Sequence, residues 1–482
     1  MLLTGILLLI LDEIIIRATM NTMKHSIPTI VSQLRTHFNI GLTRSLAYRQ
    51  QQLSGLMRFI TECEDKIIQA LHTDLRKPPA EVIIAETGLV AAELKFTQKN
   101  LANWMAPKRV RTPLIAQPGK SFLYREPLGV VLIIAPWNYP INLTLLPLIG
   151  ALAAGNTVVL KPSEIAPATS ALLATHLPNY IDPDCLTIVE GGVAETTALL
   201  NETFDHIFYT GNGTVGRIVM SAAAKHLTPV TLELGGKSPC IVDENTNLEV
   251  AAQRIVWGKF SNAGQTCTAP DYVLAHTAIH DALITKMQKF LKEFYGELPQ
   301  LCADYGRIIN ANHYQRLINL LENSGDIVIG GKGDPTDCYL APTILRNVPS
   351  DAPIMRDEIF GPILPVIRVN NMDAAIAFIN ARPKPLSLYI FTNARATYEQ
   401  MIAATSSGAV CVNFPLLQAS VPDLPFGGVG TSGMGAYHGH QSFQTFTHIK
   451  SVLIKPTWFN PSLFFPPYSS KFIRLIRWLM FK

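Results

Sequence analysis

The stretch LGVVLIIAPWNYPINLTLLPLIGALAAGNTVVLKPSE, residues 128–164, decides the fold class. Its first nine residues (128–136) form an apolar run that ends in proline, which is typical of a buried strand. Residues 143–155 have helical length and end at Gly155, a common helix C-cap. A second apolar run occupies 156–164. Strand, helix and strand in this order predict two parallel strands joined by a crossover helix.

The same alternation continues along the chain. Further strands are expected in LTIVEGG (186–192), HIFYTG (206–211) and VTLELGG (230–236), with helical stretches between them. Five apolar strands alternating with helices predict a parallel sheet covered on both faces, and therefore an α/β fold. A helix-rich segment (44–104) precedes this run, and a second mixed region follows at about 237–410. Ligands of such sheets bind at the carboxyl ends of the strands. The residues expected there are Asn138, Lys161, Gly211 and Glu233.

The composition is that of a globular protein with a sizeable core. The chain has 482 residues, of which 48% are hydrophobic and 16% charged, so we expect two or three domains. The net charge is only +4, and no long basic run precedes the C-terminus, which argues against nucleic acid as a partner. The seven cysteines form no CxxC pair, so we expect no disulfide framework, no metal site and a reducing compartment.

A glycine-rich turn follows the fourth strand, with Gly211, Gly213 and Gly216 in the spacing G-x-G-x-x-G. Glycines there allow peptide N–H groups to approach a phosphate at a helix N-terminus. The dinucleotide fingerprint belongs to the first strand-to-helix turn, so this motif alone is weak. A literal use of the fingerprint would assign Glu233, 22 residues after Gly211, to a ribose.

Glu233 in LELGGKSP and Cys267 in NAGQTCTAP allow a second interpretation. A carboxylate base and a thiol nucleophile are the two groups that covalent catalysis through a thioester needs. The polar and glycine-containing neighbours of Cys267 weigh against a core cysteine. The residues themselves leave both alternatives open, a capping carboxylate with a buried thiol or a base with its nucleophile.

Seven motifs follow one another along the chain. They are PWNYP (136–140), KPSE (161–164), YTGNGTVG (209–216), LELGGKSP (232–239), GQTC (264–267), EIFGP (358–362) and PFGGVGTSGMG (425–435). With these motifs in this order, the chain resembles the aldehyde dehydrogenase family over about residues 30–470. The form PWNYP, the segment DYGRIIN (304–310) and the PFGG block are most similar to the class 3 branch, which includes fatty, aromatic and coniferyl aldehyde dehydrogenases.

The resemblance implies oxidation of an aldehyde to its acid with NAD, with NADP as the alternative cofactor. Cys267 would attack the carbonyl carbon, Asn138 and the Cys267 peptide N–H would hold the oxyanion, and hydride transfer would leave a thioester. Glu233 would be the general base for the thiol or for the hydrolytic water. The implied cofactor residues are Lys161 and Glu164 at the adenosine ribose, Glu358 and Phe360 at the nicotinamide, and Gly211 and Gly216 under the pyrophosphate.

The resemblance also implies a homodimer and a division into domains. An NAD-binding domain would occupy 26–233, with a bridging segment at about 106–127, and a catalytic domain would occupy 234–410. The C-terminal segment 411–482 would return to the first domain and the dimer interface.

The sequence departs from the family pattern in two places. Tyr209, Asn212 and Gly213 replace typical choices in the phosphate turn, so we expect a hydroxyl contact to the phosphate to be lost or moved. Residues 413–424 differ from the sequence that is usual in the family at this place. They should line the aldehyde entrance, where their apolar side chains favour a hydrophobic aldehyde.

The expected position of Glu164 bears on the choice of cofactor. Its carboxylate would meet the 2′-phosphate of NADP, which favours NAD.

Two other activities compete with this interpretation. A CoA-acylating or phosphorylating reductase of the same superfamily would not need a base at position 233, so Glu233 favours hydrolysis. A non-redox thiol hydrolase would need a histidine to partner Cys267, and none of the seven motifs contains one.

The two ends of the chain differ from its middle. MLLTGILLLILDEIII (1–16) is apolar but too short to span a membrane and lacks a basic start, so we expect 1–25 to be a non-structural extension, with an anchor as the alternative. KFIRLIRWLMFK (471–482) is a basic amphipathic segment that either packs across the dimer or lies in a membrane interface. We expect a cytoplasmic protein, with peripheral membrane association through this tail as the alternative.

Overall fold

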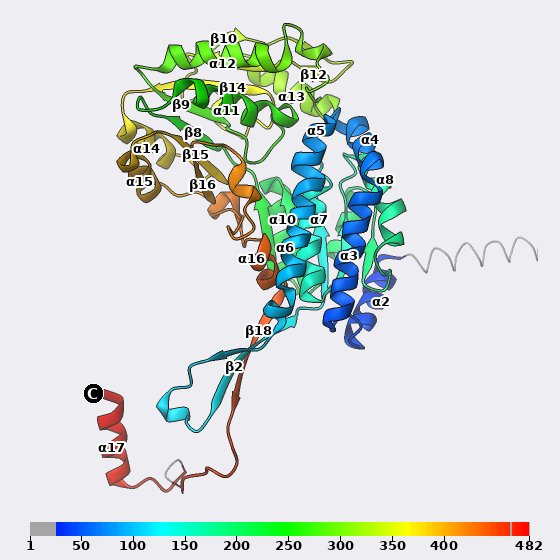
Figure 1. Ribbon diagram of the computed structural model, residues 1–482, viewed down its shortest axis with the longest axis vertical. Coiled ribbons are helices and arrows are strands. Elements are labelled where there is room, and N and C mark those ends of the chain that lie inside the picture. The colour runs from blue at the N-terminus through cyan, green and yellow to red at the C-terminus, as the bar shows by residue number, and fades with distance from the viewer. Residues whose placement is uncertain (1–25, 463–464, 482) are drawn as a thin grey trace, which may run out of the picture. The chain divides into compact units, whose positions relative to one another are not determined.

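The computed structural model describes residues 26–462 and 465–481, so the extension expected at 1–25 and the last residue of the tail lie outside it. The described chain divides into two compact units (Figure 1). The first unit contains the residues up to Trp104 together with Pro127–Thr447. The second contains Met105–Glu126 and the chain from His448 onward.

The first unit contains a six-stranded sheet built around the run of apolar strands. Its strands are β3 (Val130–Ile134), β4 (Thr157–Lys161), β5 (Leu186–Ile188), β6 (His206–Gly211), β7 (Val230–Leu234) and β17 (Gly433–Met434). The spatial order is β17-β7-β6-β3-β4-β5. The five predicted strands are parallel, and β17 pairs antiparallel with β7 at one edge. The order reverses between β3 and β6, and such a reversal opens a crevice at the carboxyl ends of the two strands.

Helices cover both faces of this sheet, as predicted. Those of the N-terminal part are α2 (Ile27–Asn39), α3 (Leu46–Glu62), α4 (Glu64–Leu75), α5 (Pro79–Val82), the π-helix η1 (Ile83–Thr87) and α6 (Gly88–Met105). Those between or after the strands are α7 (Asn142–Ala154), α8 (Pro167–His176), α9 (Val193–Leu200), α10 (Gly213–Ala224) and α16 (Gly439–Thr445). The face formed by Val130, Leu132 and Ile134 packs on α2, α9 and α10. Since successive strand residues point to opposite sides, α7 covers the other face.

Helix α7 is almost wholly buried, which explains why its sequence is apolar all round rather than striped. It ends at Gly155, whose φ of 89° is left-handed, as predicted for a glycine C-cap.

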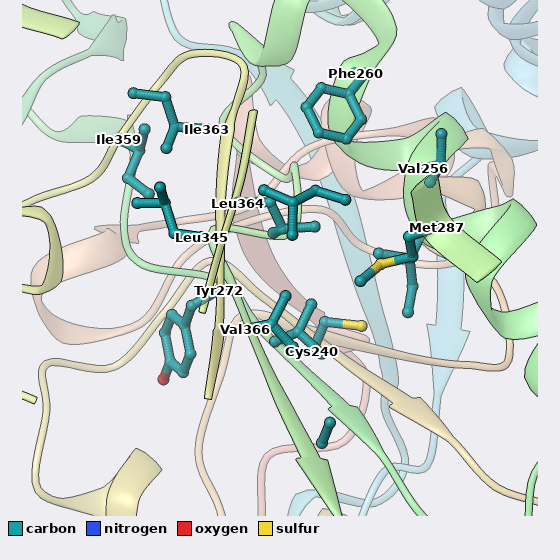
Figure 2. Packing of buried hydrophobic residues seen from close by; sticks show 14 of the residues in the cluster. Cys240, Val256, Phe260, Tyr272, Met287, Leu345, Ile359, Ile363, Leu364 and Val366 are labelled. Atoms are coloured by element: carbon teal, nitrogen blue, oxygen red, sulfur yellow. The ribbon is translucent and has the colours of Figure 1, made fainter. Parts of the chain in front are cut away.

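The first unit also contains a seven-stranded sheet with its own core. Its strands, in spatial order, are β10 (Asp326–Ile329), β13 (Thr343–Arg346), β14 (Ile363–Val369), β9 (Tyr272–His276), β8 (Pro239–Val242), β15 (Ser387–Phe391) and β16 (Ala409–Val412). All neighbours are parallel except β10 and β13. The helices of this region are α11 (Leu248–Phe260), α12 (His280–Tyr295), α13 (Ala311–Leu321), α14 (Met372–Asn380) and α15 (Arg395–Ala404), and a hairpin joins β11 (Gly333–Asp334) to β12 (Tyr339–Leu340). Figure 2 shows part of the core, with Cys240 and Val366 from the sheet and Met287 from α12.

The second unit is small and open. Its three-stranded sheet has the order β1-β2-β18, formed by β1 (Lys108–Val110), β2 (Lys120–Pro127) and β18 (Thr447–Ile454). Helix α17 (Ser470–Phe481) forms the tail. Several large apolar side chains of this unit are exposed, including Leu114, Leu453 and Trp458. Exposed apolar side chains gathered in one small unit are typical of a surface that another molecule covers.

Candidate active site

A cavity of about 440 Å³ lies at the crevice between β3 and β6. Eight of the nine site residues predicted from the sequence line it. They are Asn138, Lys161, Glu164, Gly211, Glu233, Cys267, Glu358 and Phe360. The ninth, Gly216, lies in the first turns of α10 but is not part of the lining. A Cβ at Gly216 would lie 2.9 Å from Leu234 Cδ2, so this glycine allows α10 to pack closely on β7.

The turn before Cys267 has an unusual backbone. Asn262, Ala263 and Gly264 all adopt left-handed conformations, with φ of 50°, 50° and 73°. Such a conformation costs an L-residue about 1–2 kcal/mol, so the surroundings must hold it in place. Gln265 does so, because its side-chain amide donates to the carbonyls of Asn262 at 3.1 Å and Arg307 at 2.8 Å.

The GQTC and EIFGP motifs meet at this turn. A Cβ at Gly264 would lie 2.3 Å from the carbonyl oxygen of Gly361, so only glycine permits the contact. The two motifs are therefore adjacent although almost a hundred residues separate them.

Asn138, which follows β3, is tied directly to the loop of Cys267. Its Nδ2 donates to the carbonyl of Gln265 at 3.0 Å, and its own carbonyl accepts from Asn262 Nδ2 at 2.9 Å. The next residue, Tyr139, forms a 2.9 Å hydrogen bond between its hydroxyl and Thr266 Oγ1. An amide nitrogen carries two hydrogens, so Asn138 retains one donor after binding Gln265.

Glu233 lies in β7 and is only 3% exposed. Among the described residues, neither of its carboxylate oxygens has a hydrogen-bond partner. Burial therefore raises the pKa of Glu233 well above its usual value. Strand β17 flanks it, with Gly433 in register with Glu233.

The Cys267 thiol lines the same cavity and shares this apolar setting. Burial, followed by the charges of Glu358 and Glu233, raises its pKa to about 12. The free protein therefore holds Cys267 as a thiol at neutral pH.

Glu358 reaches the cavity through a gap left by Gly235, since a Cβ on that glycine would lie 1.8 Å from Glu358 Oε2. Burial, followed by the charge of Asp271, raises the pKa of Glu358 to about 8, while the Gly236 N–H, Lys237 and Lys259 oppose the shift. Gly235 of LELGGKSP is thus needed for EIFGP to contribute its carboxylate.

Lys161 and Glu164 lie together in another part of the lining. Lys161 is buried, and its Nζ donates to Glu164 Oε2 at 3.2 Å and to the Pro162 carbonyl at 2.8 Å. Val193 and Ile218 also line the cavity and yet are 80% and 56% exposed. Exposed apolar side chains in a cavity wall are suited to cover a flat ring.

The start of α10 also borders the cavity. Asn212 caps this helix by accepting from the Val215 N–H at 2.9 Å. The positive end of the helix therefore faces the cavity, as the glycine-rich turn predicted. The Tyr209 hydroxyl donates to the Asn212 carbonyl at 3.3 Å, so this unusual residue supports the turn itself.

Some lining residues were not predicted. Trp137 packs between His313 and Phe360, with ring centroids 4.8 Å and 5.3 Å away. Arg316 also lines the cavity and donates to the Ile359 carbonyl at 2.5 Å. His313 and Arg316 belong to no motif, and their i, i+3 spacing on α13 is the only signal that they share a face.

The stretch 413–424, expected to line the aldehyde entrance, does not line this cavity. Phe414 packs on Trp257, with the ring centroids 5.6 Å apart. Ala419, Ser420 and Pro422 border a second, much smaller hollow beside Glu93 and His438.

The chain matches known proteins over most of its length. The model of the aldehyde dehydrogenase family matches residues 13–452. The chain is 51% identical to a dimeric NADP-preferring aldehyde dehydrogenase of Mus musculus over 430 residues, 89% of this chain and 95% of the relative. It is 47% identical to the 4,4′-diaponeurosporen-aldehyde dehydrogenase of Staphylococcus aureus, over 91% of this chain and 96% of the relative. A substrate-bound structure of Staphylococcus aureus AldH is similar with a TM-score of 0.92 and 46% identity, over 95% of this chain and all of that one.

Proposed function

This chain belongs to the aldehyde dehydrogenase family, and we propose that it oxidises hydrophobic aldehydes to carboxylic acids in an NAD(P)-dependent reaction. The family resemblance and the α/β fold expected from the sequence are both confirmed. The observation that carries the proposal is the cavity that joins Cys267, Asn138 and Glu233 to the residues expected to hold a dinucleotide.

The cavity residues fit NAD(P). The positive end of α10 suits the pyrophosphate, and Lys161 with Glu164 suits the adenosine ribose. Val193 and Ile218 offer exposed apolar surface for the adenine, while Trp137 and Phe360 suit the nicotinamide end together with Glu358. When bound, NAD(P)⁺ supplies the acceptor for a hydride.

Cys267 is the nucleophile in this proposal. Its Sγ forms a bond to the carbonyl carbon, the thiol proton passes to the carboxylate of the general base, and the π electrons of the carbonyl move onto its oxygen, which becomes an oxyanion. The remaining hydrogen of Asn138 Nδ2 and the Cys267 peptide N–H hold this oxyanion. The hydrogen bond from Asn138 to Gln265 fixes the amide before substrate arrives, which is the preorganisation that makes such donors effective.

Glu233 is the general base in this proposal. Its buried carboxyl has no competing hydrogen bond among the described residues, so it is free to accept a proton from the thiol or from the water that hydrolyses the thioester. A raised pKa makes its carboxylate a stronger base than an exposed one.

Two observations favour this function over its rivals. The buried Glu233 beside the thiol favours hydrolysis over transfer of the acyl group to CoA or phosphate. His313, the histidine of the cavity wall, packs against Trp137 with the two rings tilted by 52°, and it forms no hydrogen bond to Cys267 in the described structure, which disfavours a thiol hydrolase.

The hydrophobic character of the aldehyde is supported by the cavity wall. Leu143, Leu386, Phe426 and Tyr437 line the same cavity as Cys267. A related enzyme of Staphylococcus aureus is named for 4,4′-diaponeurosporen-aldehyde.

The domain assignment made from the sequence, 26–233 for NAD binding and 234–410 for catalysis, is retained in the proposal. The six-stranded and seven-stranded sheets support it, since almost all their strands fall in these two ranges. We propose a homodimer as well, with 411–482 and the bridging segment 106–127 at its interface. The exposed apolar residues of the second unit and the dimeric mouse relative support it.

The tail carries a separate proposal, that α17 lies on a membrane surface. Within the described residues no helix is long and apolar enough to cross a bilayer. At helical spacing, Phe472, Leu475 and Ile476 share one face of α17, while Arg474 and Arg477 lie on the opposite one. This pattern suits a helix in the plane of an anionic interface.

The substitution Cys267→Ala tests the proposed function. We expect it to abolish turnover of aliphatic and aromatic aldehydes with both NAD and NADP, because it removes the nucleophile. Cofactor binding, measured by fluorescence titration, should remain within about twofold, since the residues that would hold the cofactor are untouched. Retention of more than a small fraction of kcat would contradict the role of Cys267, and loss of cofactor binding would show that the substitution had disturbed the whole cavity.

A further inference from the structure

A buried ion pair lies behind the loop that carries Asn138. Lys77 Nζ and Glu86 Oε1 are 2.6 Å apart, and both side chains are fully buried. Neither residue lines the cavity. Burying two charges costs free energy of folding unless further hydrogen bonds satisfy both groups. The other hydrogen-bond partners of this pair therefore indicate its role.

In the described structure, the other side-chain hydrogen bonds of the pair all go to the Asn138 loop. Lys77 Nζ donates to the carbonyl oxygen of Asn138 at 2.9 Å and lies 3.9 Å from the ring centroid of Tyr139. Glu86 Oε2 accepts the peptide N–H groups of Ile141 at 3.1 Å and Asn142 at 2.8 Å. The pair thus binds both ends of a five-residue turn through its main chain.

The local backbone is shaped for this contact. Glu86 stands in the π-helix η1, a rare conformation that often occurs at functional sites. The Ala85 carbonyl accepts from Asn142 Nδ2 at 2.7 Å, which is a further tie between η1 and the turn. Gly88 closes the π-turn by donating to the Ile83 carbonyl, and a Cβ there would lie 2.4 Å from that oxygen.

The same segment also holds the loop of the nucleophile. Glu81 accepts the peptide N–H of Asn262 at 2.9 Å, and Asn262 Nδ2 donates to the Asn138 carbonyl that Lys77 binds. The charged residues of 77–86 therefore fix the two loops that carry Asn138 and Cys267 relative to each other.

We propose that Lys77 and Glu86 are positioning residues for the oxyanion donor: their ion pair clamps the main chain of residues 138–142, so that Asn138 Nδ2 is held where the carbonyl oxygen develops charge. This inference rests on the proposed function for the role of Asn138. It predicts that the pair acts on the steps that form an oxyanion and not on cofactor binding.

The substitution Glu86→Gln tests the inference because it keeps the shape of the side chain and removes its charge. We expect kcat to fall about 100-fold, the size of effect produced by a small misplacement of a catalytic group. The KM for aldehyde and the Kd for NAD should change by less than about threefold. Lys77→Met should give the same pattern, since it removes the other half of the clamp.

A double-mutant cycle separates positioning from general damage to the fold. In an Asn138→Ala background the oxyanion amide is absent, so Glu86→Gln should cost little further activity. Additive losses would overturn the inference, because they would mean that the pair acts independently of Asn138. If Asn138→Ala itself left kcat unchanged while Glu86→Gln lowered it, the proposed oxyanion role would fail together with the inference. If Asn138→Ala lowered kcat and Glu86→Gln did not, only the inference would fail.

Arg49→Met is the matched control. Arg49 is also buried, and it binds main-chain carbonyls of Thr43 and Ala153 at 3.0 Å, away from the cavity. Its loss should lower the melting temperature without lowering kcat. A fall in kcat for Arg49→Met equal to that for Glu86→Gln, at equal loss of stability, would attribute both effects to destabilisation and overturn the inference.

Discussion

At the scale of single residues, Glu233 combines a cost to stability with a chemical use. Burial without hydrogen bonds raises the pKa of this carboxyl, which costs stability, and the same shift makes its ionised form a stronger base than an exposed carboxylate. Residues of this kind are expected at active sites, where function opposes stability.

Glu233→Gln should therefore slow the enzyme and stabilise it. We expect one rapid turnover of NADH formation, followed by thioester hydrolysis slower by about 10²–10⁴-fold, the contribution typical of a general base. Rapid-mixing measurements would resolve the two phases. Loss of cofactor affinity with normal hydrolysis would instead support the ribose role that the glycine motif suggested for Glu233.

The pH dependence of stability provides a second measurement on the same variant. The pKa of Glu233 is raised in the folded state, so below about pH 4 both states are protonated and the residue costs nothing. As the pH rises through the unfolded pKa, the unfolded chain ionises first and wild-type stability falls by up to about 1.4 kcal/mol per pH unit relative to Glu233→Gln. The difference in melting temperature should thus be larger at pH 8.5 than at pH 5.5. An equal difference at both values would contradict a raised pKa.

Glu164 is expected to govern the choice of cofactor. Its carboxylate opposes a 2′-phosphate and holds Lys161 by a 3.2 Å contact, so Glu164→Gln should remove a repulsion and free the ammonium. We expect the ratio of kcat/KM for NADP to that for NAD to rise about tenfold, in line with the loss of one charge contact. Wild type should prefer NAD, although the mouse relative is named as NADP-preferring. Steady-state kinetics with both cofactors measure this ratio. An unchanged ratio in Glu164→Gln would show that Glu164 does not govern the choice of cofactor.

At the scale of secondary-structure elements, α17 is a short helix with much of its apolar surface exposed. Ile473, Trp478 and Phe481 are 50%, 56% and 86% exposed in the single chain. A helix of twelve residues is only about 18 Å long, so it can lie on a bilayer but not cross it.

Truncation after Ser470 tests whether α17 binds membranes. The full-length protein should sediment with vesicles of phosphatidylcholine and phosphatidylserine, and the truncated protein should not, with equal kcat on a water-soluble aldehyde. As a control, replacing Lys471, Arg474 and Arg477 by Gln keeps the apolar face and should weaken binding about 100-fold, given about 1 kcal/mol for each cation. If neither protein sediments and truncation alters the oligomeric state, the helix belongs to the dimer.

The elements differ in how far the sequence predicts them. The five parallel strands were predicted because each is a short apolar run bounded by glycine or proline, and Gly155 marked the end of α7. Strand β17 was not predicted, since Gly433 and Met434 have no strand pattern and pair with β7, which lies two hundred residues earlier in the chain. The π-helix η1 was also missed, because its apolar spacing resembles that of an ordinary helix.

At the scale of the whole molecule, the sequence again predicts some residues of the site and not others. Strand ends in the sequence predicted four residues of the cavity wall, and the resemblance to a known family implied the other four. Lys77 and Glu86 have no such signal, since a charged residue in a helical segment usually faces water. Only the folded chain shows that both are buried behind Asn138.

The pairing of β17 with β7 has a consequence for synthesis on the ribosome. All other strands of the six-stranded sheet precede residue 235, but β17 follows the entire seven-stranded sheet. A nascent chain that has emerged only as far as β16 therefore leaves β7, which contains Glu233, as an open edge able to pair with another chain. The six-stranded sheet, most of which is translated before the seven-stranded sheet, is thus completed after it, and during that interval its open edge is exposed to aggregation.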